Sequence, residues 1–305
     1  MQTGPLEIAA SVAGGAVLTG AGVLAYAACY EVRSYRLRRV EVPVLPRGAA
    51  SLRVLQISDL HLTPGQRKKV EWVRGLAALE PDMVLDTGDN LSHLLAVPAL
   101  LEAVEPLLKF PGAFVMGSND YTAPIPRNPF RYLTQRGKPQ TIKPPRPHLA
   151  LPTESMRSRF LDAGWIDLDN ARGTVIADGR TVAMVGVDDP HTQRDRYAKV
   201  AGSPPADADA TIAVTHAPYR RVLDAMSADG WPLIIAGHTH GGQVCIPGYG
   251  ALVTNCDIDT ARAKGLSRYD DSYLHVSAGL GTSRFAPVRF ACLPEATLMT
   301  LVAAA

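Results

Sequence analysis

Short apolar runs alternate with polar turns and amphipathic segments along most of the chain. Residues 52–57, 83–85 and 113–116 are apolar runs of strand length, and each ends in a polar turn. Apolar residues at helical spacing follow two of these turns, over residues 66–80 and 93–108. A repeated order of strand, turn and helix is typical of a layered α/β fold.

The second half of the chain continues with apolar runs of strand length. The turn Asp178-Gly179-Arg180 separates two of them and indicates a hairpin. The predicted strands cover residues 174–177, 181–187, 211–214, 231–236 and 296–302. The last of these is expected to close the fold.

Residues 121–152 interrupt the pattern. Prolines recur throughout this segment and exclude regular helices or strands from most of it. The segment is basic, with no acidic residue between positions 121 and 150. Two interpretations stay open: a solvated surface insertion, or a basic lip that meets an anionic substrate or phospholipid surface. The second makes Arg127 and Arg131 candidate substrate-binding residues.

The N-terminal segment from Ile8 to Tyr30 carries no charge. It is long enough to span roughly 30 Å of hydrocarbon. A buried core helix is a poorer interpretation because the segment is apolar on every face. A secretory signal peptide is also disfavoured, since no Lys or Arg precedes the apolar run.

Basic residues follow the apolar segment directly, at Arg33, Arg36, Arg38 and Arg39. By the positive-inside rule they keep the C-terminal side in the cytoplasm. We therefore predict a single-pass anchor in the cell membrane over residues 1–32, a basic linker over 33–50 and a cytoplasmic catalytic domain over 51–303.

Composition excludes some classes of function. The net charge is +2 and the pI about 8.3, which is too mild to indicate nucleic-acid binding. The cysteines are scattered without a CxxC pair and indicate ordinary thiols rather than a disulfide framework or a zinc knuckle.

Potential metal ligands follow the predicted strands. They are Asp59, His61, Asp89, Asn119, His216, His238 and His240. Open α/β sheets place their sites at the carboxyl ends of strands, so these side chains are expected to converge. Carboxylates, imidazoles and an amide together suit Mn, Fe or Zn and are poor for calcium. Two divalent cations sharing one carboxylate can clamp the attacking and leaving oxygens of a phosphoryl displacement.

Five blocks of the sequence, in order, resemble those of the calcineurin-like metallophosphoesterases. The blocks are Asp59-x-His61, Gly88-Asp89-Asn90, Gly117 to Asp120, Thr215-His216 and Gly237-His238-Thr239-His240. The flanks Gly241-Gly242-Gln243-Val244 and Gly279 to Ser283 are similar to the membrane-associated bacterial branch, which includes relatives of UDP-2,3-diacylglucosamine pyrophosphatase. The resemblance implies a four-layer αββα sandwich of two mixed sheets.

The resemblance also implies a role for each block. Asp59, His61 and His240 would hold one divalent cation, His216 and His238 the other, and Asp89 would bridge both. The catalytic candidates are Asp59, Asp89, Asn119, His216 and His238. We expect Asp120 to help orient these groups.

The third block departs from the family pattern, because Gly117-Ser118-Asn119-Asp120 replaces Gly-Asn-His-Asp. In a strict alignment with the family pattern, Ser118 occupies the position of the metal-binding asparagine. Asn119 then occupies the position of the histidine that protonates the leaving group. We favour Asn119 as a ligand, since an amide oxygen is a better donor than a serine hydroxyl. The alternative is that the second cation is held more weakly. In both cases the protonating histidine is absent, so either substrates with good leaving groups, such as phosphoanhydrides, are favoured, or another group supplies the proton.

Two further candidates for contact with substrate are His191, in an Asp-Asp-Pro turn, and Arg284; Arg289 could contact phosphate or form a salt bridge. The expected function is a membrane-anchored, dinuclear phosphoesterase that cleaves a phosphodiester or pyrophosphate in a lipid-linked or nucleotide-linked substrate. The alternatives are a phosphomonoesterase or phosphoprotein phosphatase, and a single-metal lipid-binding scaffold without turnover.

Overall fold

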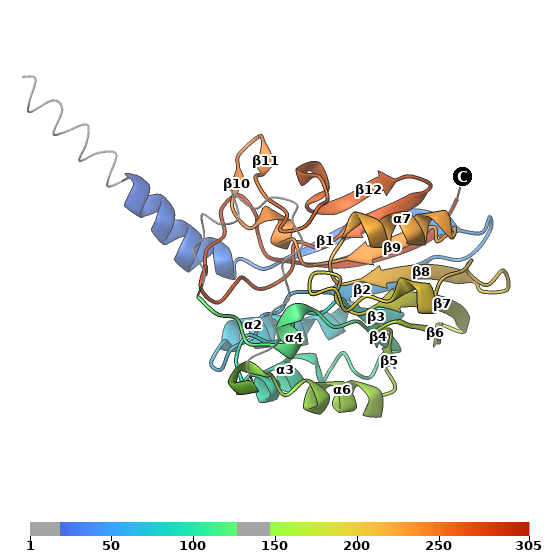
Figure 1. Ribbon diagram of the computed structural model, residues 1–305, viewed down its shortest axis with the longest axis horizontal. Helices are drawn as coiled ribbons and strands as arrows, with labels where there is room; N and C mark the ends of the chain where they lie inside the picture. Colours follow the sequence, from blue (N-terminus) through green and yellow to red (C-terminus); the bar gives the residue numbers. More distant parts are fainter. Residues whose placement is uncertain (1–18, 127–146, 305) are drawn as a thin grey trace, which may run out of the picture.

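The computed structural model describes residues 19–126 and 147–304, in which two six-stranded sheets face each other (Figure 1). The first sheet has the order β1 (Arg36–Leu45), β14 (Glu295–Ala303), β2 (Leu52–Ile57), β3 (Met83–Asp86), β4 (Gly112–Phe114) and β5 (Ile166–Asp167). The second has the order β12 (Gly265–Tyr269), β13 (Ser272–Val276), β9 (Leu233–Ala236), β8 (Ala210–Thr215), β7 (Arg180–Val187) and β6 (Ala171–Ala177). Both contain parallel and antiparallel pairs, as predicted for mixed sheets.

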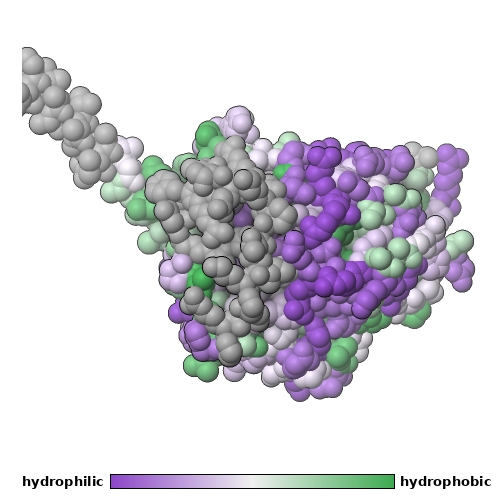
Figure 2. Space-filling model, viewed as in Figure 1, coloured by the Kyte–Doolittle hydropathy of each residue, from purple (hydrophilic) through white to green (hydrophobic). Residues whose placement is uncertain are grey.

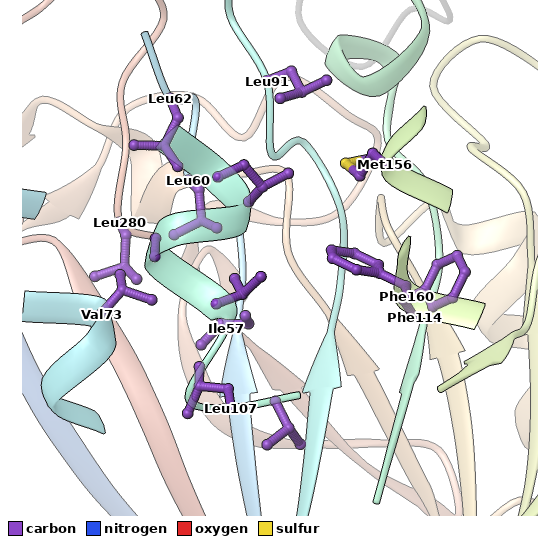
Figure 3. Close-up of a cluster of buried hydrophobic side chains, with 14 of the residues drawn as sticks. Ile57, Leu60, Leu62, Val73, Leu91, Leu107, Phe114, Met156, Phe160 and Leu280 are labelled. Atoms are coloured by element: carbon purple, nitrogen blue, oxygen red, sulfur yellow. The ribbon is translucent and has the colours of Figure 1, made fainter. Parts of the chain in front are cut away.

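Helices cover the outer face of each sheet. They are α2 (Arg67–Gly75), α3 (Val97–Val104) and α6 (Thr153–Asp162) on the first sheet, α7 (Arg220–Ala228) on the second, and the short α4 (Ser118–Tyr121). Three hydrophobic clusters separate the layers: helices against the first sheet (Figure 3), sheet against sheet, and the second sheet against α7. The arrangement is the predicted α/β sandwich of four layers.

Strand β2 shows why these runs are apolar at nearly every position. Val54 faces the second sheet, whereas Leu55 and Ile57 face the helices, and all three are fully buried. A strand covered on both faces cannot alternate between apolar and polar residues. Each such side chain contributes about 1.5–3 kcal/mol by leaving water.

The prediction of a linker over residues 33–50 is wrong for β1. This strand pairs in parallel with β14 at the edge of the first sheet. Val42 and Leu45 are buried between the sheets, and Arg38 forms an ion pair of 2.8 Å with Glu295. The arginines hid the strand pattern, and Pro43 is tolerated because β1 is an edge strand.

Residues 19–25 form a helix that leaves the domain and ends in a π-helical turn, Tyr26–Tyr30 (Figure 1). The rest of the predicted anchor, residues 1–18, lies outside the described residues. Across residues 19–126 and 147–304, no helix has both the length and the apolar character needed to cross a membrane. The candidates Arg127 and Arg131 also lie outside the described residues.

Candidate metal centre

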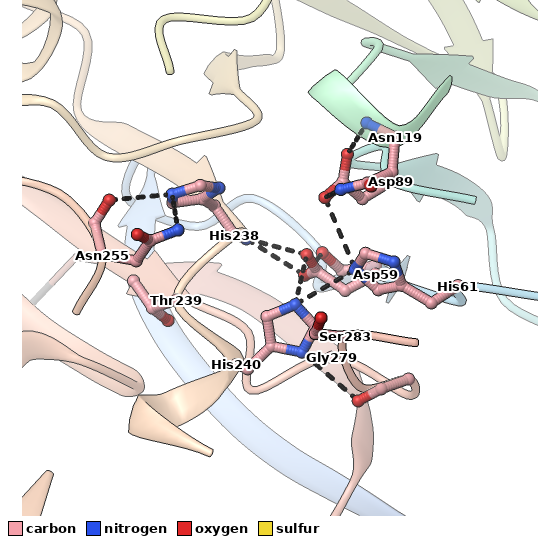
Figure 4. Close-up of polar contacts among 12 residues, drawn as sticks. Asp59, His61, Asp89, Asn119, His238, Thr239, His240, Asn255, Gly279 and Ser283 are labelled. Atoms are coloured by element: carbon pink, nitrogen blue, oxygen red, sulfur yellow. Dashed lines mark hydrogen bonds and ion pairs between the residues drawn. The ribbon is translucent and has the colours of Figure 1, made fainter. Parts of the chain in front are cut away.

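The predicted ligands come together at the carboxyl ends of the central strands of both sheets (Figure 4). Asp59 and His61 follow β2, and Asp89 follows β3. His216 follows β8, and His238 and His240 follow β9. Only His240 among these six residues is more than slightly exposed.

The six side chains form two groups of three. Asp59, His61 and His240 offer ligand atoms that all lie within 4.8 Å of one another, and so do Asp89, His216 and His238. One carboxylate and two imidazoles in each group suit a borderline first-row cation such as Mn, Fe or Zn. The residues therefore fit two divalent ions, as the sequence predicted.

Asp89 faces both groups. Its Oδ2 lies 3.4 Å from His61 Nε2 in the first group and 3.5 Å from His216 Nε2 in the second. A single carboxylate oxygen between the two histidines is placed to bridge a pair of cations.

A polar partner holds the other ring nitrogen of each histidine. His61 Nδ1 lies 2.9 Å from Ser92 Oγ, and His216 Nδ1 lies 2.7 Å from the Thr87 carbonyl. His240 Nδ1 lies 3.3 Å from the Gly281 carbonyl, and His238 Nε2 lies 3.2 Å from the Asn255 carbonyl. These contacts orient each ring so that its free nitrogen faces the centre.

Several ligand residues sit in left-handed backbone conformations that are uncommon for residues other than glycine. The φ angles are 50° for Asp59, 42° for His61, 58° for Asp89, 70° for His238 and 51° for His240. Such conformations persist where the surrounding structure over-determines them, and they concentrate at functional sites.

Gly117 gives the metal centre its close packing. A Cβ on Gly117 would lie 2.3 Å from Asp89 Oδ1 and 2.7 Å from the His216 ring, so Gly117→Ala must displace a ligand. We expect a loss of turnover on the order of 10²-fold, the typical cost of misplacing a catalytic group by about 1 Å. Gly75→Ala is the matched control, since nothing lies within 4 Å of its Cβ. Equal rates for the two variants would contradict the prediction.

Asp120 joins two of the ligand loops, in agreement with its predicted orienting role. Its buried carboxylate accepts hydrogen bonds from the backbone N–H groups of Asp89 (2.8 Å), Asn90 (2.7 Å) and Gly117 (2.9 Å). The loop after β3 is thereby tied to the loop after β4 through one side chain.

Asn119 lies against the shared carboxylate. Its backbone N–H and its side-chain Nδ2 donate to the two oxygens of Asp89, each at 2.7 Å. Ser118 Oγ lies 3.3 Å from the same Nδ2. Ser118 and Asn119, the two candidate ligands in the block that differs from the family pattern, therefore both lie next to the metal centre. Of the two, Asn119 contacts Asp89 directly.

Burial keeps most of the histidines neutral and ready to bind a cation. It lowers the pKa of His61 to about 4 and holds the pKa values of His238 and His240 well below the ordinary value. His216 differs: burial also tends to lower its pKa, but the charge and hydrogen bond of Asp89 outweigh this and raise it well above the ordinary value.

This difference predicts proton release on metal binding. In the metal-free protein at pH 7, His216 is protonated beside Asp89, and a cation can bind only the neutral ring. We expect about one proton to leave per chain, so that affinity for Mn²⁺ rises about tenfold per pH unit in this range. Calorimetric titration at pH 7 in two buffers of different ionisation enthalpy measures the proton count. A count of zero would contradict the prediction.

Of the three described residues predicted to contact the substrate, His191 and Arg284 lie near the metal centre, whereas Arg289 has a structural role. The His191 ring lies 4.4 Å from the His238 ring, centroid to centroid, and Arg284 is exposed beside the Ser92 carbonyl. Arg289, by contrast, is fully buried and donates to the backbone carbonyls of Ala278, Gly279 and Gly281 at 2.7, 3.0 and 2.6 Å. It organises the loop that packs on Asp59, and among the described residues its side chain forms no salt bridge with a carboxylate.

Two residues that orient the ligands were not predicted from the sequence. Ser92 and Asn255 orient His61 and His238, but neither belongs to a block, and serine and asparagine are common in loops. For Ser92, the spacing of three residues after Asp89 was the one available hint.

Comparison with known proteins agrees with this geometry. The model of the calcineurin-like phosphoesterase family matches residues 52–242. The chain belongs to this family. The match spans the blocks at Asp59, Asp89, His216 and His238.

Three bacterial relatives are similar over most of the chain. The uncharacterized metallophosphoesterase YkuE of Bacillus subtilis is 26% identical over 276 residues, covering 86% of this chain and 83% of YkuE. The B. subtilis protein YpbG is 27% identical over 258 residues, covering 84% and 83%. The phosphodiesterase YaeI of Escherichia coli is 23% identical over 277 residues, covering 88% of each chain.

Proposed function

We propose that the chain hydrolyses a phosphodiester or pyrophosphate bond with two divalent cations, one in each group of three ligands. The position of Asp89 carries the proposal, because one of its oxygens lies within 3.5 Å of a histidine from both groups. Bound cations of this kind polarise phosphoryl oxygens and activate water. The name of YaeI, a phosphodiesterase, supports the same reaction class.

The protein's own residues supply orientation and exclusion of water. Ser92 and the carbonyls of Thr87, Asn255 and Gly281 fix the imidazoles, so little reorganisation is needed when substrate binds. We assign Asn119 to the second group as an amide ligand. Its side-chain amide, whose Nδ2 now donates to Asp89, would turn over so that its oxygen faces the cation. His191 lies beside His238 of the second group, Arg284 lies beside the Ser92 loop of the first, and both would contact the substrate.

We further propose a lipid-linked or nucleotide-linked substrate at the cell membrane, of the kind represented by UDP-2,3-diacylglucosamine. The support is the uncharged segment from Ile8 to Tyr30, the arginines that follow it, and the flanking residues Gly241 to Val244. In this proposal the N-terminal segment is a single-pass anchor and the catalytic domain is cytoplasmic.

Hydrolysis of bis-p-nitrophenyl phosphate by the full-length chain tests the reaction. We expect turnover with Mn²⁺ and its loss with a chelator. Because no histidine occupies position 119 to protonate a leaving group, p-nitrophenolate esters and anhydrides should react faster than alkyl esters. Absence of turnover with Mn, Fe and Zn in turn would refute the proposal, and p-nitrophenyl phosphate as the better substrate would favour a phosphomonoesterase.

A further inference from the structure

Exposed large hydrophobic side chains gather on the loops beside the Asp59, His61 and His240 group. They are Leu94, Leu95, Val244, Ile246, Tyr249 and Phe285, which we call the apolar rim, and their exposed fractions run from 41% to 74%. Single exposed apolar residues are ordinary on a protein surface. Six of them on adjoining loops beside a candidate functional site are a different matter, because apolar patches of this kind mark interaction surfaces.

Hydrogen bonds join the loops that carry the two halves of the rim. Leu94 and Leu95 follow Ser92, whose carbonyl lies 3.5 Å from Arg284 Nη1, and Phe285 is the next residue. The loop that carries Phe285 then rests on Gln243, whose Nε2 donates to the Ala286 carbonyl at 2.8 Å. Val244 is the neighbour of Gln243, so the loops that carry the rim residues adjoin one another.

The rim runs on to the N-terminal helix. Ile246 and Tyr249 lie in the small hairpin of β10 (Cys245–Ile246) and β11 (Gly250–Ala251), and the Cys245 N–H donates to the Phe290 carbonyl at 2.8 Å. Val244 pairs with Phe290, and the Phe290 ring meets Tyr26 edge-on, with centroids 6.5 Å apart. Figure 2 shows hydrophobic residues clustered where the helix emerges.

One loop that carries rim residues also contacts the metal centre. Ser92 Oγ lies 2.9 Å from His61 Nδ1, so the loop bearing Leu94 and Leu95 is the loop that orients a ligand. A surface seated on the rim would therefore lie next to the Asp59, His61 and His240 group.

We propose that the apolar rim inserts into the interface of a phospholipid bilayer and holds the metal centre against that surface. Three observations select this occupant. The uncharged segment from Ile8 to Tyr30 is followed directly by the domain, and its described part, residues 19–30, meets Phe290 beside the rim through Tyr26. Tyr26 and Tyr30 are exposed aromatic residues of the kind found at membrane interfaces. The exposed Arg33 at the base of the helix suits anionic headgroups.

The consequence for catalysis rests on the proposed function. With the rim inserted, a lipid-linked phosphate would reach the two ligand groups without leaving the bilayer. The orientation itself does not depend on that activity and can be tested separately.

Site-directed fluorescence on the full-length chain tests the orientation. In a Cys29→Ser background, Leu95→Cys and Tyr249→Cys are labelled with an environment-sensitive nitrobenzoxadiazole group in phosphatidylcholine–phosphatidylglycerol vesicles. Ile176→Cys on β6 is the matched control, since Ile176 is 59% exposed and lies away from the rim. We expect lipid-borne nitroxide to quench the labels at 95 and 249 at least twofold more than the label at 176.

Two results would overturn the proposal. One is equal quenching at all three positions. The other is a blue shift of the rim labels that grows with protein concentration in the absence of vesicles, which would assign the rim to a second copy of the chain. Hydrolysis of bis-p-nitrophenyl phosphate in detergent should be unchanged in the Leu95→Ser, Tyr249→Ser double variant. Failure of the wild-type chain to hydrolyse this diester would remove the proposed function while leaving the quenching result intact.

Discussion

Replacing Asp89 with asparagine is expected to reduce hydrolysis of bis-p-nitrophenyl phosphate by at least about 10³-fold. Lewis-acid stabilisation by bound cations is worth several kcal/mol in such reactions, and each ~1.4 kcal/mol is a factor of ten in rate. Asp89 is the residue on which both ligand groups depend, since its Oδ2 lies 3.4 and 3.5 Å from His61 and His216. The amide keeps the shape of the side chain and removes the charge that a bridging ligand supplies.

Metal analysis separates this explanation from a folding defect. We expect the wild-type chain to bind two Mn²⁺ ions and Asp89→Asn to bind fewer, with an unchanged circular dichroism spectrum. Asp162→Asn is the control, because Asp162 is an exposed carboxylate at the end of α6 and should match the wild type. Two bound ions and wild-type turnover in Asp89→Asn would mean that the carboxylate is not shared.

The sequence predicted the centre better than it predicted the edges of the fold. Strands β2, β3, β7, β8, β9 and β14 were all predicted, because the buried interior of a layered sheet produces apolar runs that stand out from their flanks. The metal ligands follow four of these strands, so finding the strands also located the centre.

Three of the strands that were not predicted share a different physical situation. Strands β1, β5 and β12 lie at sheet edges, where one side of the strand lacks a partner and polar residues are tolerated. Arg36 to Arg39 in β1 and Ser267-Arg268 in β12 hide any alternation. The predicted helix at 93–108 is shorter in the structure, Val97–Val104, because residues 91–96 turn around the metal centre instead.

Contacts between side chain and backbone were the least predictable part of the site. Arg289 had no carboxylate partner to suggest its role, and its carbonyl acceptors exist only once the loop at residues 278–281 has folded. The role of Asp120 was harder to predict for the same reason, since nothing in the sequence indicates which N–H groups donate hydrogen bonds to it.

Asp120→Ala is expected to lower the free energy of unfolding by at least about 3 kcal/mol and to abolish turnover. The three backbone N–H groups that Asp120 accepts would lose their partner, and a buried unsatisfied donor costs about 1–3 kcal/mol. Burial and the nearby Asp89 raise the pKa of Asp120, while the N–H groups of Gly117 and Asn90 oppose that rise. The same hydrogen bonds therefore stabilise the ionised carboxylate of Asp120 and fix the position of the loop that carries Asp89.

Urea unfolding of the full-length chain in chelator measures this effect without the stabilisation that bound cations add. Asp120→Asn should fall between Asp120→Ala and the wild type, because its single carbonyl oxygen can accept only part of the set. Asp162→Ala should stay within about 0.5 kcal/mol of the wild type, as surface substitutions usually do. If Asp120→Ala unfolds at the wild-type urea concentration yet loses turnover, Asp120 acts in catalysis and not as the tie between the loops after β3 and β4.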